Sequence, residues 1–434
     1  MVIKMKELWN ETIKMPRFLP LAEDLKTDVL IIGGGLAGLL TAWRLERAGV
    51  SYALIEADRI CGGVTARTTA KITAQHGLIY QRLAKQCGSD CARGYYEANQ
   101  WAVREYERLC RGMDCDFEER DAWVYSSGEL RPLLKELTAL QRMGLKFDLQ
   151  RDLPLPFAVG GIRMEGQGQF NPLKFAAAIA GNLNLYEQTP ALAYDGGVQT
   201  PGGRITADKI VVATHFPIFN KHGGYFIKLY QQRSYVLGLE GIPPLNGMFL
   251  EEGGLSLRSY GDVLLLGGGS HRTGKPSAGW EPLKRAARQY FPAGRERYRW
   301  ATQDCISLDG IPYIGRYAKG KEDLYVASGF NKWGMTGSML ASRLLADALL
   351  DRASPWRGLF APNRSLLRSQ IFANGAEAVV GMLRLRKPRC PHMGCALQWN
   401  PHEHSWDCSC HGSRFTEQGK RLENPAVGDL KNKR

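Results

Sequence analysis

Residues 27–58 read TDVLIIGGGLAGLLTAWRLERAGVSYALIEAD, and this stretch decides the fold of the first part of the chain. An apolar run, Val29–Ile32, predicts a buried strand that leads into glycines with the spacing G-x-G-x-x-G, namely Gly33, Gly35 and Gly38. A helical pattern of apolar residues follows as far as Gly49, and a second predicted strand, Tyr52–Ile55, ends at Glu56. Strand, glycines, helix, strand and acid in this order predict a dinucleotide-binding unit.

Each part of this unit has a physical role. The first glycine allows a tight turn, the second lets the backbone approach a pyrophosphate, and the third lets helix and strand pack closely. The helix N-terminus favours an anion, and Glu56 is placed to accept hydrogen bonds from a ribose. A second helix, predicted to begin near Gly334–Gly337 after a strand at Leu324–Ala327, provides another such N-terminus. A plain NAD domain does not need it, which favours FAD.

Composition sets limits on the class of protein. The chain has 434 residues, 44% hydrophobic and 23% charged, which suits a globular protein of two or three domains. The net charge of +14 could attract an acidic partner or anionic lipid, but no recognised nucleic-acid motif accompanies it, so no nucleic-acid partner is expected. No apolar run reaches the roughly 18 residues of a transmembrane segment. The N-terminal residues lack the apolar core of a secretory signal, and the predicted location is cytoplasmic.

Ten cysteines in a chain predicted to be cytoplasmic favour metal or redox roles over a disulfide scaffold. Cys87 and Cys91 stand at helical spacing, four residues apart, and are expected to be ordinary thiols. The cysteines without a ligand-like pattern are Cys61, Cys87, Cys91, Cys110, Cys115 and Cys305.

The first 350 residues resemble the FAD-dependent D-amino-acid oxidase superfamily, near glycine and sarcosine oxidases and D-amino-acid dehydrogenases. Besides the glycine loop with Glu56, the resemblance rests on GGVTARTTAKIT at 62–73, FNPLKFAAAIA at 170–180, ISLDGIPYIGR at 306–316 and ASGFNKWGMTGS at 327–338. It implies a Rossmann-like α/β FAD-binding domain with an interleaved antiparallel substrate domain. The expected boundaries are 1–79, 176–214 and 301–350 for the first, and 80–175 and 215–300 for the second.

The same resemblance implies where FAD is bound. Backbone N–H groups near Gly334, Met335 and Thr336 are expected to face the flavin pyrimidine, where they stabilise negative charge on the reduced ring. The expected FAD-binding residues are Gly33, Gly35, Leu36, Ala37, Gly38, Glu56, Ala57, Gly63, Thr68, Thr69, Ala191, Thr214, Gly334, Met335 and Thr336.

The chain has one good dinucleotide fingerprint. LLLGGGSHRTG at 264–274 lacks the spacing, the following helix and the acid, whereas enzymes that reduce flavin with NAD(P)H usually show a second fingerprint. A substrate is therefore expected to meet the flavin directly, which favours oxidation of a small amine or amino acid. The weak candidates for substrate contacts are Arg233, which could clamp a carboxylate, Tyr225 and Tyr235 on predicted strands, and His271. A surface arginine and packed tyrosines are an equally good interpretation, and no catalytic acid or base is assigned.

The last fifty residues contain two pairs of soft ligands. Cys390 and His392 stand one residue apart, and fifteen residues later Cys408 and His411 complete the pattern C-x-H…C-x-x-H. Zinc sites usually run C-x₂₋₄-C or H-x₃₋₅-H, so a zinc site is the competing hypothesis. In a Rieske [2Fe–2S] centre each loop provides one thiolate and one imidazole, and two Cys hold one iron while two His hold the other.

This segment, with CPHMGC and CSCHGS, resembles the Rieske family. The resemblance implies a disulfide between Cys395 and Cys410, as in cytochrome bc-type members, although the cytosol disfavours it. It also implies that Ser413 hydrogen-bonds a bridging sulfide, while Phe415 replaces a tyrosine that raises the potential in other members. His402 and His404 are expected to be loop residues and not ligands. Exposed imidazoles at the cluster would offer an exit for electrons.

Residues 351–384 are predicted to be a linker and residues 385–434 a small Rieske subdomain that leans on the flavoprotein. The favoured hypothesis is an FAD- and [2Fe–2S]-dependent oxidoreductase that passes electrons from a small amine or amino acid to an unidentified acceptor protein or quinone. Two alternatives stay open. One is an oxidase that uses oxygen and has a structural C-terminal metal, and the other is a non-catalytic redox sensor or electron carrier.

Overall fold

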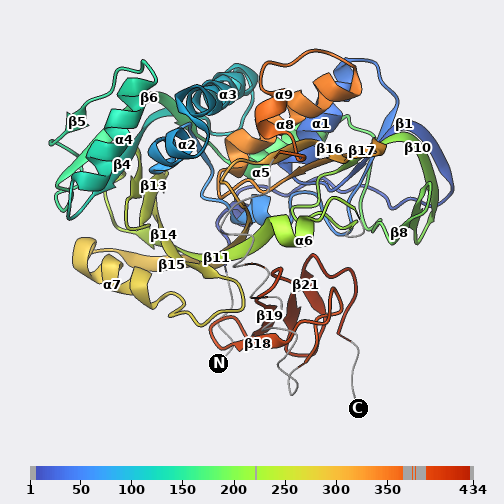
Figure 1. Cartoon of the computed structure of the whole chain (residues 1–434). Coiled ribbons are helices and arrows are strands. Elements are labelled where there is room, and N and C mark those ends of the chain that lie inside the picture. Colours follow the sequence, from blue (N-terminus) through green and yellow to red (C-terminus); the bar gives the residue numbers. More distant parts are fainter. Residues whose placement is uncertain (1–5, 220–221, 365–373, 375–376, 378–387, 431–434) are drawn as a thin grey trace.

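The computed structural model describes residues 6–219, 222–364, 374, 377 and 388–430. Three sheets organise this part of the chain (Figure 1). The first sheet lies on the right of the figure, the second on the left, and the third, in red, lies below both. This arrangement confirms the predicted fold class of an α/β domain, an interleaved antiparallel sheet and a small C-terminal subdomain.

The first sheet has the strand order β16-β17-β10-β1-β2-β7, with β9 and β8 added beside β10. Neighbouring strands from β17 to β7 run parallel, and helices α1, α5 and α8 lie together above the sheet in Figure 1. The strands are β1 (Leu25–Ile32), β2 (Tyr52–Ile55), β7 (Leu185–Tyr186), β8 (Ala193–Tyr194), β9 (Val198–Thr200), β10 (Gly203–Val212), β16 (Tyr313–Ala318) and β17 (Lys321–Ser328). The helices are α1 (Leu36–Arg47), α5 (Pro172–Ala180) and α8 (Gly334–Leu349).

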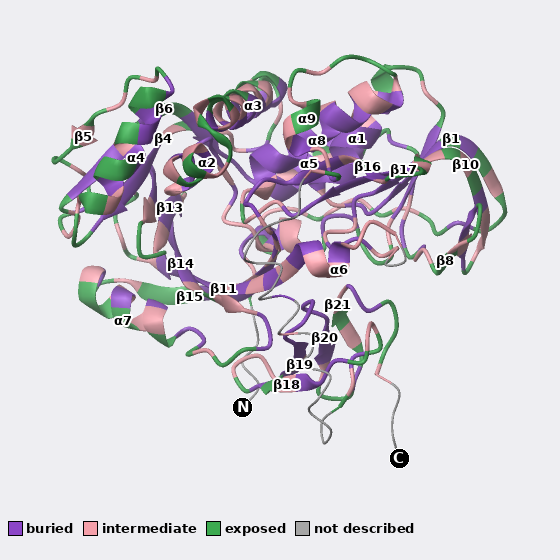
Figure 2. Cartoon of the chain, viewed as in Figure 1, coloured by how far each residue is buried: buried purple, intermediate pink, exposed green. Residues whose placement is uncertain are grey.

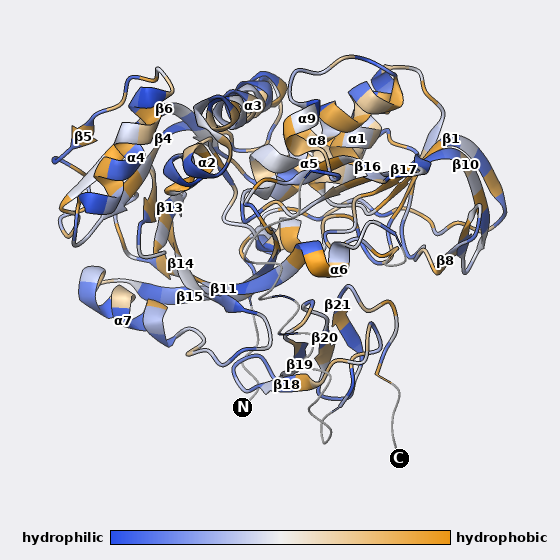
Figure 3. Cartoon of the chain, viewed as in Figure 1, coloured by the Kyte–Doolittle hydropathy of each residue, from blue (hydrophilic) through white to orange (hydrophobic). Residues whose placement is uncertain are grey.

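Burial explains why these segments form the centre of the sheet. Val29–Ile32 and Tyr52–Ile55 are buried at every position. Figure 2 shows buried segments gathered in the first sheet and its covering helices, and Figure 3 shows that apolar residues are frequent there. A central parallel strand is covered on both faces, so a continuous apolar run is stable there. The two strands predicted at the glycine loop are therefore confirmed, and both end at the same edge of the sheet.

The second sheet has the order β15-β11-β14-β13-β12-β4-β6-β3, and β5 pairs with β6. Its strands are β3 (Lys71–Ile72), β4 (Glu118–Ser126), β5 (Leu149–Gln150), β6 (Gly160–Gln169), β11 (Leu229–Glu240), β12 (Met248–Glu251), β13 (Ser256–Tyr260), β14 (Val263–Arg272) and β15 (Arg295–Ser307). The remaining helices are η1 (Trp9–Glu11), η2 (Val64–Arg67), α2 (Ile79–Cys87), α3 (Ser89–Cys110), α4 (Arg131–Arg142), α6 (Tyr225–Lys228), α7 (Glu281–Tyr290) and α9 (Arg357–Phe360). The segment 264–274, which was not expected to bind a dinucleotide, mostly belongs to β14.

The third sheet is the antiparallel meander β18 (Leu397–Asn400), β19 (Ser405–Cys408), β20 (Arg414–Thr416) and β21 (Arg421–Glu423). Its buried apolar core is small and includes Leu397, Phe415 and Ala426. Most of the predicted linker at 351–384 lies outside the described residues. In the described part of the chain, no helix combines the length and apolar character that crossing a bilayer requires.

Two expectations about single residues are wrong. Tyr225 lies in the short helix α6 and not on a strand, and its buried hydroxyl donates to the carbonyl of Tyr317 at 2.8 Å. Cys87 and Cys91 form a disulfide. The two do not share one helix, because α2 ends at Cys87 and Gly88, with a φ of +91°, turns the chain before α3 begins.

Candidate functional site

The glycine loop between β1 and α1 has no room for side chains. Gly33 has a φ of +115°, and a Cβ there would lie 2.6 Å from the carbonyl oxygen of Ala213. A Cβ on Gly38 would lie 1.9 Å from the carbonyl oxygen of Gly33. The first glycine thus makes the turn and the third allows helix and strand to pack, as the spacing predicts.

Glu56, at the end of β2, holds this loop with its carboxylate. Oε2 accepts from the backbone N–H of Gly34 at 2.7 Å, and Oε1 accepts from that of Asp58 at 2.9 Å. Burial raises the pKa of Glu56 above its ordinary value, although both N–H groups oppose the shift. The carboxylate lines a large cavity together with the glycine loop.

The cavity has a volume of about 770 Å³ and runs between the first and second sheets. Thirteen of the fifteen predicted FAD-binding residues line it, and Gly38 and Thr336 do not. Gly38 is buried in the packing of α1, and the Thr336 hydroxyl lies 3.3 Å from Nε2 of His76. The thirteen are Gly33, Gly35, Leu36, Ala37, Glu56, Ala57, Gly63, Thr68, Thr69, Ala191, Thr214, Gly334 and Met335.

The N-terminus of α8 is supported by the side chain of His76, which contacts Trp333 and Thr336. The His76 ring stacks on Trp333 with 4.3 Å between centroids, and its nitrogens bond the Tyr95 hydroxyl at 2.8 Å and the Thr73 carbonyl at 2.7 Å. Burial lowers the pKa of His76 to about 3, so the ring is neutral. No atom lies within 4 Å of a Cβ built on Gly334, so the backbone at this helix N-terminus is open to a ligand. The glycine cradle, Glu56 and this N-terminus fit FAD.

Several residues line the cavity that the sequence did not single out. The second sheet and the segments beside it contribute polar side chains to the cavity wall. Arg59 also lines the cavity near Glu56, and its guanidinium pairs with the carboxylate of Glu187 at 2.5 Å. The overlooked polar residues are Lys71, His215, Ser234, Ser256, Asp304 and Lys332. Lys71 stands two residues after the predicted FAD contact Thr69, and this proximity is a local signal in the sequence.

The weak substrate candidates have different outcomes. Tyr235 lines the cavity and stacks on His271, with 5.7 Å between centroids. His271 itself does not line the cavity, and its Nδ1 lies 3.2 Å from the carbonyl of Gly269. Arg233 does not line the cavity either, because it points to the third sheet, where its guanidinium is fully engaged. The hypothesis that Arg233 clamps a substrate carboxylate is therefore wrong.

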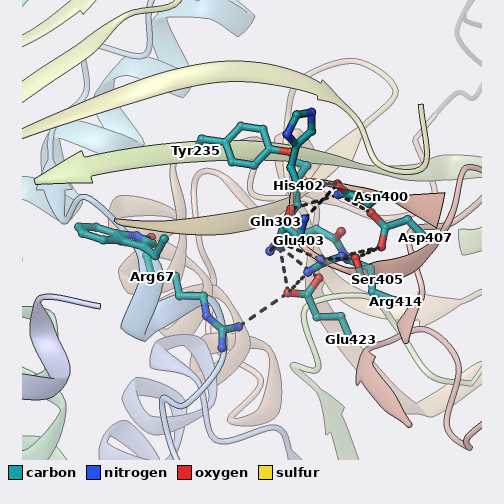
Figure 4. A network of polar contacts seen from close by, with 12 residues as sticks. Arg67, Tyr235, Gln303, Asn400, His402, Glu403, Ser405, Asp407, Arg414 and Glu423 are labelled. Atoms are coloured by element: carbon teal, nitrogen blue, oxygen red, sulfur yellow. Dashed lines mark hydrogen bonds and ion pairs between the residues drawn. The ribbon is translucent and has the colours of Figure 1, made fainter. Parts of the chain in front are cut away.

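Arg233 belongs to a buried ion network at the boundary with the C-terminal subdomain. Figure 4 labels its members Arg67, Glu403, Asp407, Arg414 and Glu423. Its Nε donates to Glu403 at 2.9 Å and its Nη1 to Glu423 at 3.0 Å. Arg414 lies on the other side and donates to Glu403 at 2.8 Å and to Asp407 at 2.9 Å. Arg67, from η2, reaches Glu423 at 3.7 Å. Three arginines thus face three carboxylates, and two of the arginines come from the flavoprotein.

The C-terminal subdomain brings the predicted cluster ligands together. The thiols of Cys390 and Cys408 interact directly, and the rings of His392 and His411 lie 4.8 Å apart between centroids. Both ring nitrogens of His392 and Nδ1 of His411 are buried without a hydrogen-bond partner. Orphaned imidazole nitrogens beside paired thiols fit a cluster that takes two thiolates and two neutral imidazoles.

The sulfurs of Cys395, Cys408 and Cys410 lie within 4.8 Å of one another, which resembles a mononuclear metal site. We assign Cys408 to the [2Fe–2S] ligands, with Cys390, His392 and His411. In such a cluster the four ligands are divided between two irons, so they do not all point at one metal ion. Cys395 and Cys410 are free thiols in the structure, so the disulfide expected between them is not formed there. The Ser413 hydroxyl accepts from the N–H of Ala426 at 3.0 Å.

Histidines outside the ligand set have other roles. Nε2 of His402 lies 3.0 Å from the carbonyl of Ser277, and the ring of His404 lies beside Trp399. Phe415 is fully buried in the small core. The expectation of exposed cluster imidazoles is wrong for His411, which is 3% exposed because the flavoprotein covers it.

Side chains of the second sheet hold the cluster loops by their backbone carbonyls. Gln231 donates to the carbonyl of His411 at 2.9 Å, and Gln303 donates to that of Gly412 at 2.9 Å. Arg272 donates to the carbonyls of Ser409 at 2.9 Å and Cys410 at 3.1 Å. The ligand loops are therefore fixed against β11, β14 and β15.

One short loop after β10 touches both the cavity and the cluster site. Thr214 and His215 line the cavity, and the ring of Phe216 lies 6.2 Å from the rings of both His392 and His411, between centroids. Asn424 of the C-terminal subdomain donates to the carbonyl of Phe216 at 3.2 Å. Six residues of that subdomain line the cavity themselves, namely Arg421, Leu422, Glu423, Asn424, Ala426 and Val427.

Comparisons with known proteins agree with this geometry. The family model described as FAD dependent oxidoreductase matches residues 28–348, and that of the Rieske [2Fe-2S] domain matches residues 369–433. The putative Rieske 2Fe-2S iron-sulfur protein YhfW of Bacillus subtilis is 33% identical over 98% of this chain and 96% of its own. Gamma-glutamylputrescine oxidoreductase of Escherichia coli is 25% identical over 77% of this chain and 86% of its own.

Among solved structures, glycine oxidase from Geobacillus kaustophilus has the same fold. It superposes with a TM-score of 0.67 and 20% identity, covering 79% of this chain and all of its own. The FAD-dependent oxidoreductase model ends at residue 348, before the third sheet, which falls within the range of the Rieske model. The chain belongs to the FAD-dependent oxidoreductase family, binds FAD, and carries a C-terminal Rieske domain that binds a [2Fe–2S] cluster.

Proposed function

We propose that this oxidoreductase oxidises a small amine or amino acid at FAD and passes the electrons through the Rieske cluster to a separate acceptor. One observation carries the proposal: residues of the cluster subdomain form part of the wall of the FAD cavity. A cofactor bound in that cavity lies beside the subdomain that holds the second cofactor. FAD accepts two electrons and can release them singly, which suits a one-electron cluster.

The chain's own residues support an internal route. His215 and Phe216 connect the cavity to the two cluster imidazoles within two consecutive residues. The loop is held by Asn424, and the ligand loops are held by Gln231 and Gln303. Because electron transfer weakens steeply with distance, contacts that fix this spacing favour rapid transfer.

The substrate class is supported by the position of the second sheet. Residues of the second sheet, among them Tyr235 and Ser256, line the cavity together with the predicted FAD-binding residues, and no second dinucleotide fingerprint occurs in the sequence. The relatives named above include an oxidoreductase of a putrescine derivative and a glycine oxidase. An amine or amino acid that reaches the flavin directly is the simplest substrate for such a cavity.

The test is anaerobic mixing of the purified protein with a panel of amines and amino acids. Flavin absorbance is followed in time, the cluster is quantified by electron paramagnetic resonance, and iron and zinc are measured on the same sample. We expect two irons per chain, as a [2Fe–2S] cluster requires, and reduction of the cluster after the flavin.

Other outcomes would favour the alternatives. Zinc in place of iron, with peroxide formed in air, would support an oxidase with a structural metal. A flavin that no amine or amino acid reduces, in protein with an intact cluster, would contradict the proposed substrate class and favour a sensor or carrier.

A further inference from the structure

Lys71 lines the cavity, and no carboxylate of the described residues forms an ion pair with its ammonium group. It lies on β3, directly after the FAD-binding segment, and pairs in register with Gln169 of the second sheet. Its Nζ donates to the hydroxyl of Ser256 on β13, and both residues line the cavity. Within the described residues, Lys71 forms no ion pair.

Most of the other cations near the cavity have an acidic neighbour or point away from the cavity; Arg421, from the C-terminal subdomain, also lines it. Arg59 pairs with Glu187 and Arg67 with Glu7 at 2.7 Å, while Lys332 lies near Asp304. The arginines of the second sheet do not line the cavity. Arg233 is held by the C-terminal subdomain, and Arg258 donates to the backbone carbonyl of Ala70 at 2.7 Å.

We propose that Lys71 is the anchor for a carboxylate on the substrate, so that the substrate is an amino acid or an N-substituted amino acid and not a plain alkylamine. This inference rests on the proposed function and narrows its substrate class. The ammonium group of Lys71 is partly buried and has only a hydroxyl partner. It therefore gains from an anion, because a charge-assisted hydrogen bond offsets the solvation that the group has lost.

The surroundings of Lys71 suit such a ligand. Thr68 and Thr69, two and three residues before it, line the cavity among the FAD-binding residues, so a carboxylate at Nζ would place the rest of a small molecule near the flavin. Leu250 and Tyr235 also line the cavity and offer apolar surface for a side chain. Burial and the neighbouring Arg258 lower the pKa of Lys71 to about 7, so a bound anion would stabilise its charged form.

The test measures equilibrium binding of benzoate to the FAD-loaded, full-length protein, from the change in flavin absorbance below pH 7. Benzamide, which has the same shape without the charge, is titrated in parallel. We expect Lys71→Met to weaken benzoate binding by about tenfold or more and to leave benzamide binding within about twofold. Lys71→Arg, which keeps the charge, should bind benzoate within a few fold of the original protein.

A matched control is Lys284→Met, which removes a lysine on α7 that is half-buried like Lys71, pairs with Glu281 and does not line the cavity. It should leave both affinities unchanged. Equal benzoate affinity in Lys71→Met and the original protein would overturn the anchor, as would failure of benzoate to perturb the flavin at all.

The two proposals fail in different ways. If benzoate binding depends on Lys71 but no amine or amino acid reduces the flavin, the anchor stands and the proposed oxidation does not. If alkylamines without a carboxylate reduce the flavin as fast as amino acids, the oxidation stands and the anchor does not.

Discussion

Lys71 is a half-buried lysine whose protonation state depends on its surroundings. Burial is the main cause of its lowered pKa of about 7, and Arg258 adds to it, since both disfavour the protonated form. Ser256 and Arg258, both on β13, are the polar groups that the structure places against it. Ordinary lysines stay charged to pH values near 10, so this position titrates in a range where activity is measured.

We predict that benzoate affinity depends on pH with the sign set by this lysine. Below about pH 7 the ammonium group is present and binding is strong, whereas above that pKa affinity should fall by about tenfold per pH unit. Benzoate stays ionised throughout, so the midpoint reports on the protein. Titrations from pH 6 to about pH 9 measure the effect, and a flat profile in the original protein would argue against Lys71 as the titrating group.

The role of Arg233 depends on contacts with residues that are far away in the sequence. Arg233 looked like a candidate for a carboxylate clamp, and it does bind carboxylates, but those of Glu403 and Glu423. That Arg233 binds carboxylates was predictable from the residue type. Its partner was not, because the two glutamates lie 170 and 190 residues further along the chain.

At the scale of elements, the loop after β10 joins the two cofactor sites. β10 is a central strand of the first sheet, so its C-terminal end lies beside the glycine loop of β1, as a parallel arrangement requires. Phe216, four residues after the end of β10, belongs to the flavoprotein core and contacts the rings of His392 and His411. The same loop therefore belongs to both sites.

We predict that Phe216→Leu slows electron transfer from the flavin to the cluster while leaving the FAD and iron contents unchanged. The loss of a buried aromatic ring should cost about 1 to 2 kcal/mol of stability and lengthen the contact with both imidazoles. Light-driven reduction of the flavin, followed in time by absorbance and by electron paramagnetic resonance of the cluster, measures the rate without a known substrate. Phe219→Leu, in the same loop but packed on Tyr194, is the control. An unchanged rate in Phe216→Leu would exclude this loop as the route.

At the scale of the whole molecule, charge complementarity joins the C-terminal subdomain to the flavoprotein. Within the network, the subdomain contributes Arg414 and three carboxylates, and the flavoprotein contributes Arg67 and Arg233 (Figure 4). Separating the two parts would leave carboxylates without partners. Burial alone would raise the pKa of Glu403, but Arg233 and Arg414 lower it to about 2.

We predict that Arg233→Met destabilises the protein by about 3 to 5 kcal/mol, because it leaves Glu403 charged and buried with one partner fewer. The double variant Arg233→Met, Glu403→Gln should recover part of that loss, since it removes the unpaired charge as well. Thermal or denaturant unfolding measures both. Arg93→Met, which breaks an exposed pair with Glu97, should stay within about 1 kcal/mol.

The pH dependence of this stability has a defined sign. The folded pKa of Glu403 lies below its ordinary value of 4.5, so the contribution is fully present above about pH 4.5 and is lost as the pH falls towards about 2. In the double variant this acid-dependent part should be smaller than in the original protein. An equal loss in both would place the acid sensitivity elsewhere.

By itself, the sequence determined the features that depend on local spacing. The glycine loop, the strands that flank it, Glu56 and the start of α8 follow from residues close together in the chain, because backbone geometry and periodicity act over short distances. The Cys and His spacing likewise predicted a Rieske site, since each loop carries its own pair of ligands.

Only the tertiary structure decided how these local units face one another. It turned the cluster imidazoles towards Phe216, engaged Arg233 with two glutamates, left Lys71 without a carboxylate, and joined Cys87 to Cys91 across a break at Gly88. The physical reason is that burial and charge pairing depend on which surfaces meet, and here, apart from the disulfide, those surfaces come from segments far apart in the chain.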